Sequence, residues 1–230
     1  MVSGGARGLG AAITKALVLS GWKVSVGVRD PQVAREQLGD LVDSVHIATF
    51  DATDKSAPDR WTDEVLSEFG GLDALVNNAG ILRMVNLDKG TEDDLDMMWE
   101  VNFKAPFRLC RAVLPHLRKT GHGRVISIAS TDGKRYRDAT ASLGYVVTKH
   151  ALVQLNHAVR FAGWDDGVRA TAICPGAVDT DMIANIPGVT PKAERLKPET
   201  LGDVVTFLLG LPNEASVAEF VANTRLESSL

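Results

Sequence analysis

Residues 1–13 read MVSGGARGLGAAI and place glycines at positions 4, 8 and 10 directly before an apolar, helix-like run. Glycine tolerates positive φ and lets a ligand approach the backbone closely. A glycine turn that leads into a helix presents unpaired N–H groups and the positive end of the helix dipole, which suits a phosphate group. The spacing is GxxxGxG, which differs from the GxGxxG dinucleotide fingerprint. The loop therefore predicts a phosphate-binding turn, with a plain flexible turn as the alternative.

Strand-like and helix-like segments alternate along the rest of the chain. The strand-like runs are 23–28, 44–50, 72–80, 123–130 and 168–176, and the helix-like runs are 9–20, 57–69, 93–118, 145–161 and 198–209. This alternation is typical of βαβ units around a parallel sheet. We therefore expect an α/β fold: one Rossmann-type domain over residues 1–230, a single doubly wound parallel sheet with helices on both faces.

Composition excludes several classes of function. The chain has 230 residues, 45% of them hydrophobic, and a net charge of −4, so bulk electrostatics favour neither nucleic acid nor an anionic membrane. No apolar run is long enough to cross a bilayer, and we expect a cytoplasmic protein without a secretory signal. Cys110 and Cys174 have no metal-binding spacing, and the histidines form no HExxH motif, so we expect no metal site.

Five short motifs carry a family resemblance. SGGARGLG (3–10) resembles the TGxxxGxG loop of the short-chain dehydrogenase/reductase family, and NNAG (77–80) resembles its second signature. Tyr145 and Lys149 in GYVVTKHAL match its YxxxK motif. CPGAVDTDM (174–182) is similar to its PGxxxT loop, and Asn102 in WEVNFKAPF matches its helix asparagine.

This resemblance implies a catalytic set of Asn102, Ser130, Tyr145 and Lys149. Tyr145 is the expected general acid in reduction and general base in oxidation. Lys149, one helical turn away, is expected to lower the pKa of that phenol and to hold the nicotinamide ribose. Ser130 is expected to bind the substrate carbonyl, or alternatively only to cap its own turn. Asn102 implies a water-linked proton relay through Lys149. The alternative is an irregularity of the helix whose free backbone groups are satisfied by the Asn102 side chain itself.

The cofactor expected from the same resemblance is NADP(H), with NAD(H) possible. The second strand ends at Val28, where the family usually places an acid that selects NAD. Arg29 follows and would pair with a 2′-phosphate, and Arg7 adds a second cation. Asp30 would select NAD instead if the strand ended one residue later. The expected cofactor-binding residues are Gly4, Arg7, Gly8, Leu9, Gly10, Arg29, Asp51, Asn77, Ala79, Gly80, Tyr145, Lys149, Gly176, Val178 and Thr180.

Both ends of the chain depart from the family pattern. Only Met1 and Val2 precede Ser3, so we expect a truncated first strand, either a stub or one whose true start lies upstream. The glycine-rich C-terminal motif of the family is missing, although VAEFVAN (217–223) is suited to a last strand. We expect a homodimer, formed through helices 93–118 and 145–161, or a homotetramer.

The substrate is expected to be a small ketone or aldehyde, or its alcohol. Residues 180–198 should form a short lid, made mobile by Pro187 and Gly188. The segment between Ser130 and Tyr145 is about two residues longer than in the family and falls in residues 131–143, which we call the insertion. Its cations Lys134, Arg135 and Arg137 would either steer an anionic substrate or form a solvated loop. The function expected is a carbonyl oxidoreductase, and the alternative is a catalytically idle NADP-binding sensor of the same fold.

Overall fold

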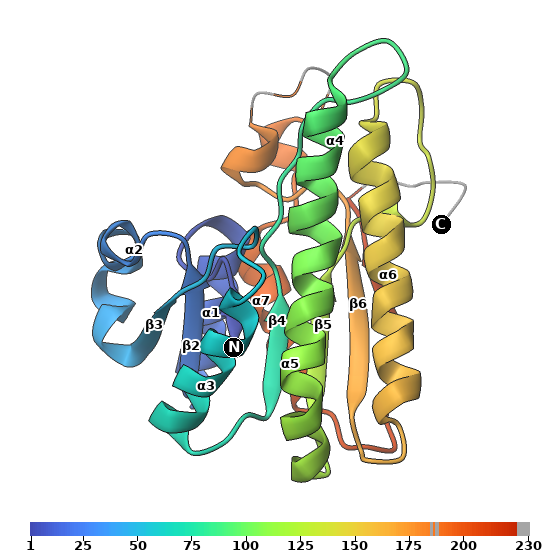
Figure 1. Cartoon of the computed structure of the whole chain (residues 1–230). Helices are drawn as coiled ribbons and strands as arrows, with labels where there is room; N and C mark the ends of the chain where they lie inside the picture. Colours follow the sequence, from blue (N-terminus) through green and yellow to red (C-terminus); the bar gives the residue numbers. More distant parts are fainter. Residues whose placement is uncertain (185, 187–188, 225–230) are drawn as a thin grey trace.

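The computed structural model describes residues 1–184, 186 and 189–224, and its centre is a seven-stranded parallel sheet (Figure 1). The strands lie in the order β3-β2-β1-β4-β5-β6-β7. Their bounds are β1 Val2–Ser3, β2 Val24–Val28, β3 Val45–Thr49, β4 Ala74–Asn77, β5 Arg124–Ile128, β6 Arg169–Pro175 and β7 Glu219–Ala222. The strand order reverses between β1 and β4, and such a reversal opens a ligand crevice at the carboxyl ends of the strands.

Seven α-helices lie in the part of the chain that the structure describes. They are α1 Gly8–Leu19, α2 Pro31–Leu38, α3 Ala57–Phe69, α4 Glu92–Trp99, α5 Ala105–Thr120, α6 Leu143–Gly163 and α7 Pro198–Leu209. In Figure 1, α5 and α6 stand in front of the sheet and α1 and α7 lie behind it. The expected doubly wound sheet is confirmed.

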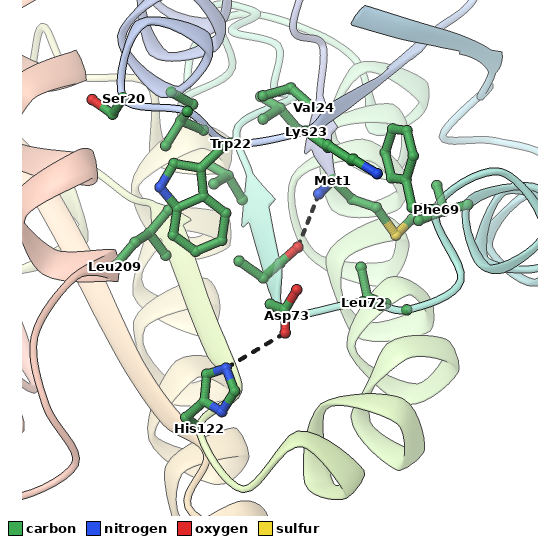
Figure 2. A pocket seen from close by; sticks show the side chains of 17 residues that line it. Met1, Ser20, Trp22, Lys23, Val24, Phe69, Leu72, Asp73, His122 and Leu209 are labelled. Atoms are coloured by element: carbon green, nitrogen blue, oxygen red, sulfur yellow. Dashed lines mark hydrogen bonds and ion pairs between the residues drawn. The ribbon is translucent and has the colours of Figure 1, made fainter.

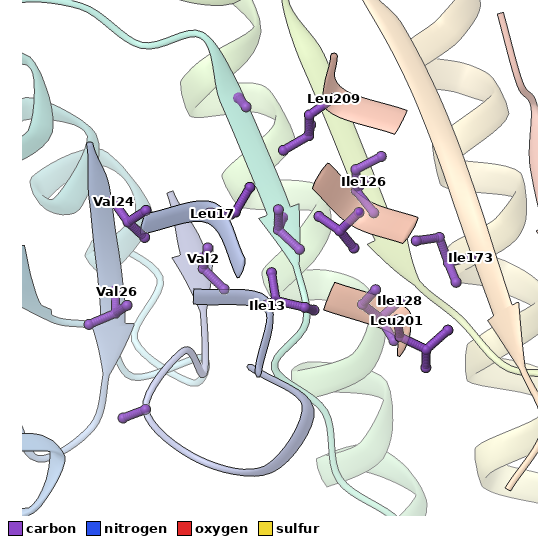
Figure 3. Packing of buried hydrophobic residues seen from close by; sticks show 14 of the residues in the cluster. Val2, Ile13, Leu17, Val24, Val26, Ile126, Ile128, Ile173, Leu201 and Leu209 are labelled. Atoms are coloured by element: carbon purple, nitrogen blue, oxygen red, sulfur yellow. The ribbon is translucent and has the colours of Figure 1, made fainter. Parts of the chain in front are cut away.

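Two apolar cores hold the layers together, one on each face of the sheet. Ile13 and Leu17 of α1 and Leu201 of α7 pack on Val26 and Ile126 of the sheet, and all five are buried (Figure 3). The opposite face packs against α3, α5 and α6 through a second cluster. Because both faces are covered, the strands read as continuous apolar runs rather than alternating ones.

Strand β1 comprises Val2 and Ser3 and lies between β2 and β4 in the sheet. Val2 pairs with Val26 of β2 and with Val76 of β4, so even this short strand joins the two halves of the sheet. The Met1 amino group donates a hydrogen bond of 2.9 Å to the Ala74 carbonyl oxygen. The predicted last strand is also present as β7.

A cavity of about 490 Å³ lies at the end of the sheet where β1, β2 and β4 begin (Figure 2). Met1, Trp22, Lys23, Asp73 and His122 are among its lining residues. The glycine loop follows the other end of β1. The cavity is therefore at the wrong edge of the sheet to belong to the predicted site, which collects residues from the carboxyl ends of the strands.

Two local features were not predicted. Helix α2 begins directly after β2: Asp30 caps it, with Oδ1 accepting hydrogen bonds from the backbone N–H of Gln32 and Val33, and Pro31 occupies its first turn. The expected helix 93–118 is interrupted by a π-helical turn, η2, at Glu100–Lys104. Such turns occur mostly as single-turn bulges within α-helices and are frequent at functional sites.

Candidate active site

The glycine loop has the conformation that its sequence predicts. Gly4 and Gly8 adopt φ values of +65° and +52°, a region that other residues rarely occupy. A Cβ placed on Gly10 would lie 2.1 Å from the Gly4 carbonyl oxygen, so only glycine fits there. Arg7 occupies the N-cap of α1, and within the described chain this helix start has neither a side-chain cap nor an acidic residue in its first turn. Its N–H groups and positive dipole end therefore suit a phosphate.

Ser3 and Asn78 hold this loop against the end of β4, and the sequence reasoning missed both. Ser3 Oγ accepts hydrogen bonds of 3.0 Å from the backbone N–H groups of Asn78 and Ala79. Asn78 Nδ2 donates to the carbonyl oxygens of Ser3 at 3.0 Å and Gly4 at 3.2 Å. The signal was present in the NNAG motif, whose second asparagine follows the strand.

Asn77, which was expected at the adenosine, turns its side chain away from the loop. It is 2% exposed, and its Nδ2 donates to Cys110 Sγ of α5 at 3.4 Å. The alternation of side chains along β4 explains this placement, because Asn77 and Asn78 point to opposite faces. The side chain of Asn77 therefore faces α5, and the contact of this residue with the cofactor remains a prediction.

Helix α6 presents Tyr145 and Lys149 beside the end of β5. Ser142 begins the helix, and its Oγ accepts a hydrogen bond of 3.3 Å from the Tyr145 backbone N–H. Lys149 Nζ lies 5.5 Å from the centroid of the Tyr145 ring and donates to the Ile128 carbonyl oxygen at 2.7 Å. Ser130, two residues beyond Ile128, lies within hydrogen-bonding reach of the phenol. The three predicted side chains are thus brought together.

The electrostatics of this group differ from the expectation. Burial raises the pKa of Tyr145 above its ordinary value, the carboxylate of Asp132 raises it further, and the hydrogen bond with Ser130 opposes both. Burial also lowers the pKa of Lys149 to about 8, with a smaller opposing effect of Cys174. Lys149 was expected to lower the pKa of the tyrosine, but in this structure burial and Asp132 outweigh any such effect.

Asn102 lies in the π-helical turn η2 and is fully buried. Its Oδ1 accepts from the Ile81 N–H at 2.8 Å, and its Nδ2 donates to the Ile81 carbonyl oxygen at 2.9 Å and to Thr148 Oγ1 at 3.2 Å. A Cβ on Gly80 would lie 3.4 Å from Asn102 Oδ1 and 3.5 Å from Lys149 Nζ, so these groups are close neighbours. The amide fixes the chain after NNAG beside α6, and although the helix is irregular at this point, the Asn102 side chain bonds Ile81 and Thr148 rather than its own helix.

The charged residues expected at the adenosine end have distinct surroundings. Strand β2 ends at Val28, as predicted, and Arg29 and Arg7 are both exposed. The carboxylate of Asp30 is engaged as the cap of α2. Asp51 lies just beyond β3, and its Oδ1 accepts from the backbone N–H and the hydroxyl of Thr53, each at 2.8 Å.

The segment after β6 meets the glycine loop from the other side. A Cβ on Gly8 would lie 3.6 Å from Thr180 Cγ2, so the two predicted cofactor loops are adjacent. Val178 forms a parallel β-bridge with Leu196, so the two ends of the expected lid lie side by side. Gly176 packs on Asn223 after β7. Asn185, Pro187 and Gly188, of which the last two were expected to make the lid mobile, lie outside the described residues.

The insertion has its cations engaged. Lys134 forms an ion pair with Glu219 of β7, and Glu219 also accepts from His157 Nε2 at 2.9 Å. Arg137 Nε pairs with the neighbouring Asp138 at 3.0 Å. Arg135 has an interaction partner as well. These contacts weaken the case for steering an anionic substrate, because a paired cation contributes little net field.

The residues present fit a bound dinucleotide. The open start of α1 suits the pyrophosphate, and Lys149, with three N–H donors and one of them given to Ile128, has two left for ribose hydroxyls. Across the described residues, no cluster of three or more metal-ligating side chains occurs. The same part of the chain contains no helix long and apolar enough to cross a membrane.

Comparisons with known proteins identify the family of this chain. The family model for short chain dehydrogenases matches residues 1–188. Agropine synthesis reductase of Rhizobium rhizogenes is 36% identical over 218 residues, which cover 94% of this chain and 50% of that protein. The chain thus spans about half the length of that relative. A 3-alpha-(or 20-beta)-hydroxysteroid dehydrogenase of Mycobacterium tuberculosis is 31% identical over 230 residues, covering 97% of this chain and 86% of that protein.

Solved structures give the same result for the fold. An alcohol dehydrogenase from the archaeon Thermococcus sibiricus, complexed with 5-hydroxy-NADP, superposes with a TM-score of 0.83 at 31% identity and covers 96% of this chain and 93% of its own. ElxO with NADP bound has a TM-score of 0.84 at 20% identity, which shows the fold alone.

Proposed function

We propose a reaction for this chain, which belongs to the short chain dehydrogenase family: reversible reduction of a small ketone or aldehyde to its alcohol, with a preference for NADP(H). The observation that carries this proposal is the meeting of Ser130, Tyr145 and Lys149 at the carboxyl end of β5, with the glycine loop at the same edge of the sheet. Groups suited to acid–base chemistry, to a carbonyl and to a dinucleotide therefore lie at one edge of the sheet.

In the proposed mechanism the chain moves one proton and orients the carbonyl. A nicotinamide dinucleotide, which the glycine loop and Lys149 would hold, would supply the hydride for the carbonyl carbon. The Ser130 hydroxyl donates a hydrogen bond to the carbonyl oxygen, and Tyr145 transfers its phenolic proton to that oxygen as the alkoxide charge develops. Lys149 stabilises the phenolate that remains, because an ammonium group nearby favours the charged form. Oxidation of the alcohol reverses each step.

The high pKa of Tyr145 in this structure is compatible with that role. A phenol held protonated by burial is a stable proton donor for reduction. The neighbouring Lys149, whose pKa is about 8, is largely protonated at neutral pH. We propose that its charge becomes effective at the phenolate only when substrate and dinucleotide exclude water from the site, since the interaction strengthens as the local dielectric falls.

The NADP(H) preference rests on Arg29 and Asp30. Arg29 directly follows β2 and is exposed, so its guanidinium is available for a 2′-phosphate. Asp30 caps α2 with its carboxylate, which leaves it poorly placed to select the 2′-hydroxyl of NAD. Fluorescence titration with NADPH and NADH tests this preference: we expect at least tenfold tighter binding of NADPH, and a loss of that difference in Arg29→Ala. Equal affinities in the wild type would refute it.

The catalytic proposal is tested by Tyr145→Phe. This variant should lose turnover by about 100- to 10,000-fold, the usual contribution of a general acid or base, while its NADPH affinity stays close to that of the wild type. A variant that keeps full activity would refute the mechanism. A wild-type chain that binds NADPH but reduces none of a broad panel of carbonyl compounds would instead favour the idle sensor.

We also propose a homodimer through α5 and α6, with a homotetramer as the alternative. The long front helices expose apolar side chains, namely Phe107 at 40% and Val147 at 38% of their surface. Multi-angle light scattering measures the assembly directly. Phe107→Asp should lower the measured mass towards that of a monomer, whereas Leu19→Asp, at an equally apolar but distant position on α1, should not.

A further inference from the structure

We infer that Asp132 is a specificity-determining residue that favours carbonyl substrates with a hydrogen-bond donor, hydroxyl or ammonium, on the carbon next to the carbonyl. The inference rests on the proposed carbonyl chemistry of Ser130 and Tyr145. It assigns a chemical class to the substrate, and it names a group outside the four expected catalytic residues.

Asp132 is held at the reacting end of the site by the turn that follows β5. It lies in η3 (Thr131–Gly133), and its backbone N–H donates to Ser130 Oγ at 3.1 Å. The Gly133 N–H donates to the Ser130 carbonyl oxygen at 2.9 Å, which closes the turn. A Cβ on Gly133 would lie 2.9 Å from the Lys149 carbonyl oxygen, so this turn packs directly on α6. The position of Asp132 relative to Tyr145 is therefore fixed from two sides.

The carboxylate of Asp132 has no hydrogen bond or ion pair with any part of the chain that the structure describes. It is only partly exposed, and burial raises its pKa. The charged groups that face it are Arg137, Arg135, Asp138 and His150, and its charge also acts on the Tyr145 phenol. Lys134 is turned to Glu219 and Arg137 Nε to Asp138, so these two cations have other carboxylate partners.

A partly desolvated carboxylate without a donor is costly unless a ligand supplies one. A substrate whose carbonyl oxygen contacts Ser130 and Tyr145 places the neighbouring carbon within the reach of this turn. A hydroxyl or ammonium group on that carbon would donate to Asp132, and a charge-assisted hydrogen bond of this kind is stronger than a neutral one. A carboxylate in place of that carbon, as in pyruvate, would be repelled. The Asp132 carboxylate therefore adds a negative charge beside the phenol, opposite in sign to the three cations of the insertion.

The experiment compares substrates of one size that differ only beside the carbonyl: hydroxyacetone, aminoacetone, butan-2-one and pyruvate, each with NADPH. In the wild type, kcat/KM for hydroxyacetone or aminoacetone should exceed that for butan-2-one at least tenfold, and pyruvate should be the poorest substrate. Asp132→Asn should reduce the ratio of the donor-bearing substrate to butan-2-one at least fivefold, and Asp132→Glu should restore part of it. Asp63→Asn, which removes an exposed carboxylate on α3 outside the insertion, is the control and should keep the wild-type ratio.

A binding measurement keeps the test independent of turnover. Propane-1,2-diol and propan-2-ol are titrated against Tyr145→Phe saturated with NADP⁺, in which oxidation is blocked; the diol should bind at least fivefold tighter, and adding Asp132→Asn should remove the difference. Equal binding of the two alcohols, or an unchanged preference in Asp132→Asn, overturns the inference even if the enzyme is active. Discrimination in binding without any turnover would leave Asp132 supported and would count against the proposed reaction, which Tyr145→Phe tests separately.

Discussion

Substitution of Gly10 by alanine sets two opposing effects against each other. Gly10 lies in the first turn of α1, where alanine is favoured over glycine by about 1 kcal/mol. A Cβ at this position, however, would lie 2.1 Å from the Gly4 carbonyl oxygen and 2.6 Å from Asn78 Nδ2, whereas ordinary contact begins at 3.4 Å. The Gly4 carbonyl must therefore move by more than one ångström.

That movement separates the two segments that form the crevice. Strain from overpacking costs about 1–3 kcal/mol, and the two hydrogen bonds of Asn78 to Ser3 and Gly4 contribute about 0.5–1.5 kcal/mol each. The losses exceed the gain in helix propensity, so we expect Gly10→Ala to lower the free energy of unfolding by about 2–4 kcal/mol. NADPH affinity should fall at least tenfold, because the N–H groups of the loop are displaced from the phosphate.

Urea unfolding followed by tryptophan fluorescence measures the first quantity, and NADPH titration measures the second. Gly71→Ala is the matched control, since nothing lies within 4 Å of the Cβ that alanine would add there and the φ of Gly71 is not positive. It should stay within about 1 kcal/mol of the wild type and keep its NADPH affinity. If Gly10→Ala matched Gly71→Ala in both its free energy of unfolding and its NADPH affinity, the close approach of Gly4 and Gly10 would be refuted.

Buried polar groups give three further predictions. Ser3→Ala leaves the N–H groups of Asn78 and Ala79 without their acceptor and should cost about 2–5 kcal/mol in urea unfolding; a loss below about 1 kcal/mol would contradict this. Burial holds the pKa of Lys149 near 8, below its ordinary 10.5, so between these values the folded chain binds fewer protons than the unfolded chain and the free energy of unfolding rises with pH. Lys149→Met should show a smaller rise in stability over that window, and an identical pH profile would argue against the shift. Asn156, fully buried with no partner for either amide atom among the described residues, should tolerate leucine with a gain of about 1 kcal/mol or more; destabilisation would indicate that a buried water satisfies it.

The fold was predictable because its signals are local and repeated. Apolar runs of strand length alternate with helix-length runs, and this pattern alone requires a parallel sheet covered on both faces. Helix α2 was missed although its start is visible: Asp30 followed by Pro31 is a helix N-terminus signature. Asp30 was considered only as a ribose ligand, and reading it first as a cap would have placed the end of β2 and weakened the NAD alternative at once.

The contents of the site were less predictable because they depend on contacts between distant segments. Motif spacing placed Tyr145, Lys149 and Ser130 together, since strand ends and helix faces fix them. It could not show that Asn77 turns towards Cys110 while Asn78 binds the glycine loop, because that depends on which face of β4 each residue occupies. Nor could motif spacing show that the pKa of Tyr145 is shifted upward, because burial and the neighbouring Asp132 of the insertion set that direction.

The insertion shows why counting the charged residues of a segment in the sequence does not predict the charge that acts on the site. Lys134, Arg135 and Arg137 outnumber the acids Asp132 and Asp138 there, and the sequence alone therefore suggests a positive rim. The ion pair that removes Lys134 from the pocket involves Glu219, 85 residues away on the last strand. Lys134 is held at β7 and Arg137 is paired beside it, and among the charges of the insertion the carboxylate of Asp132 is the one that acts on the Tyr145 phenol. A site with this arrangement should select substrates by the donors they carry, and the same carboxylate, by keeping the phenol protonated, should favour reduction over oxidation at neutral pH.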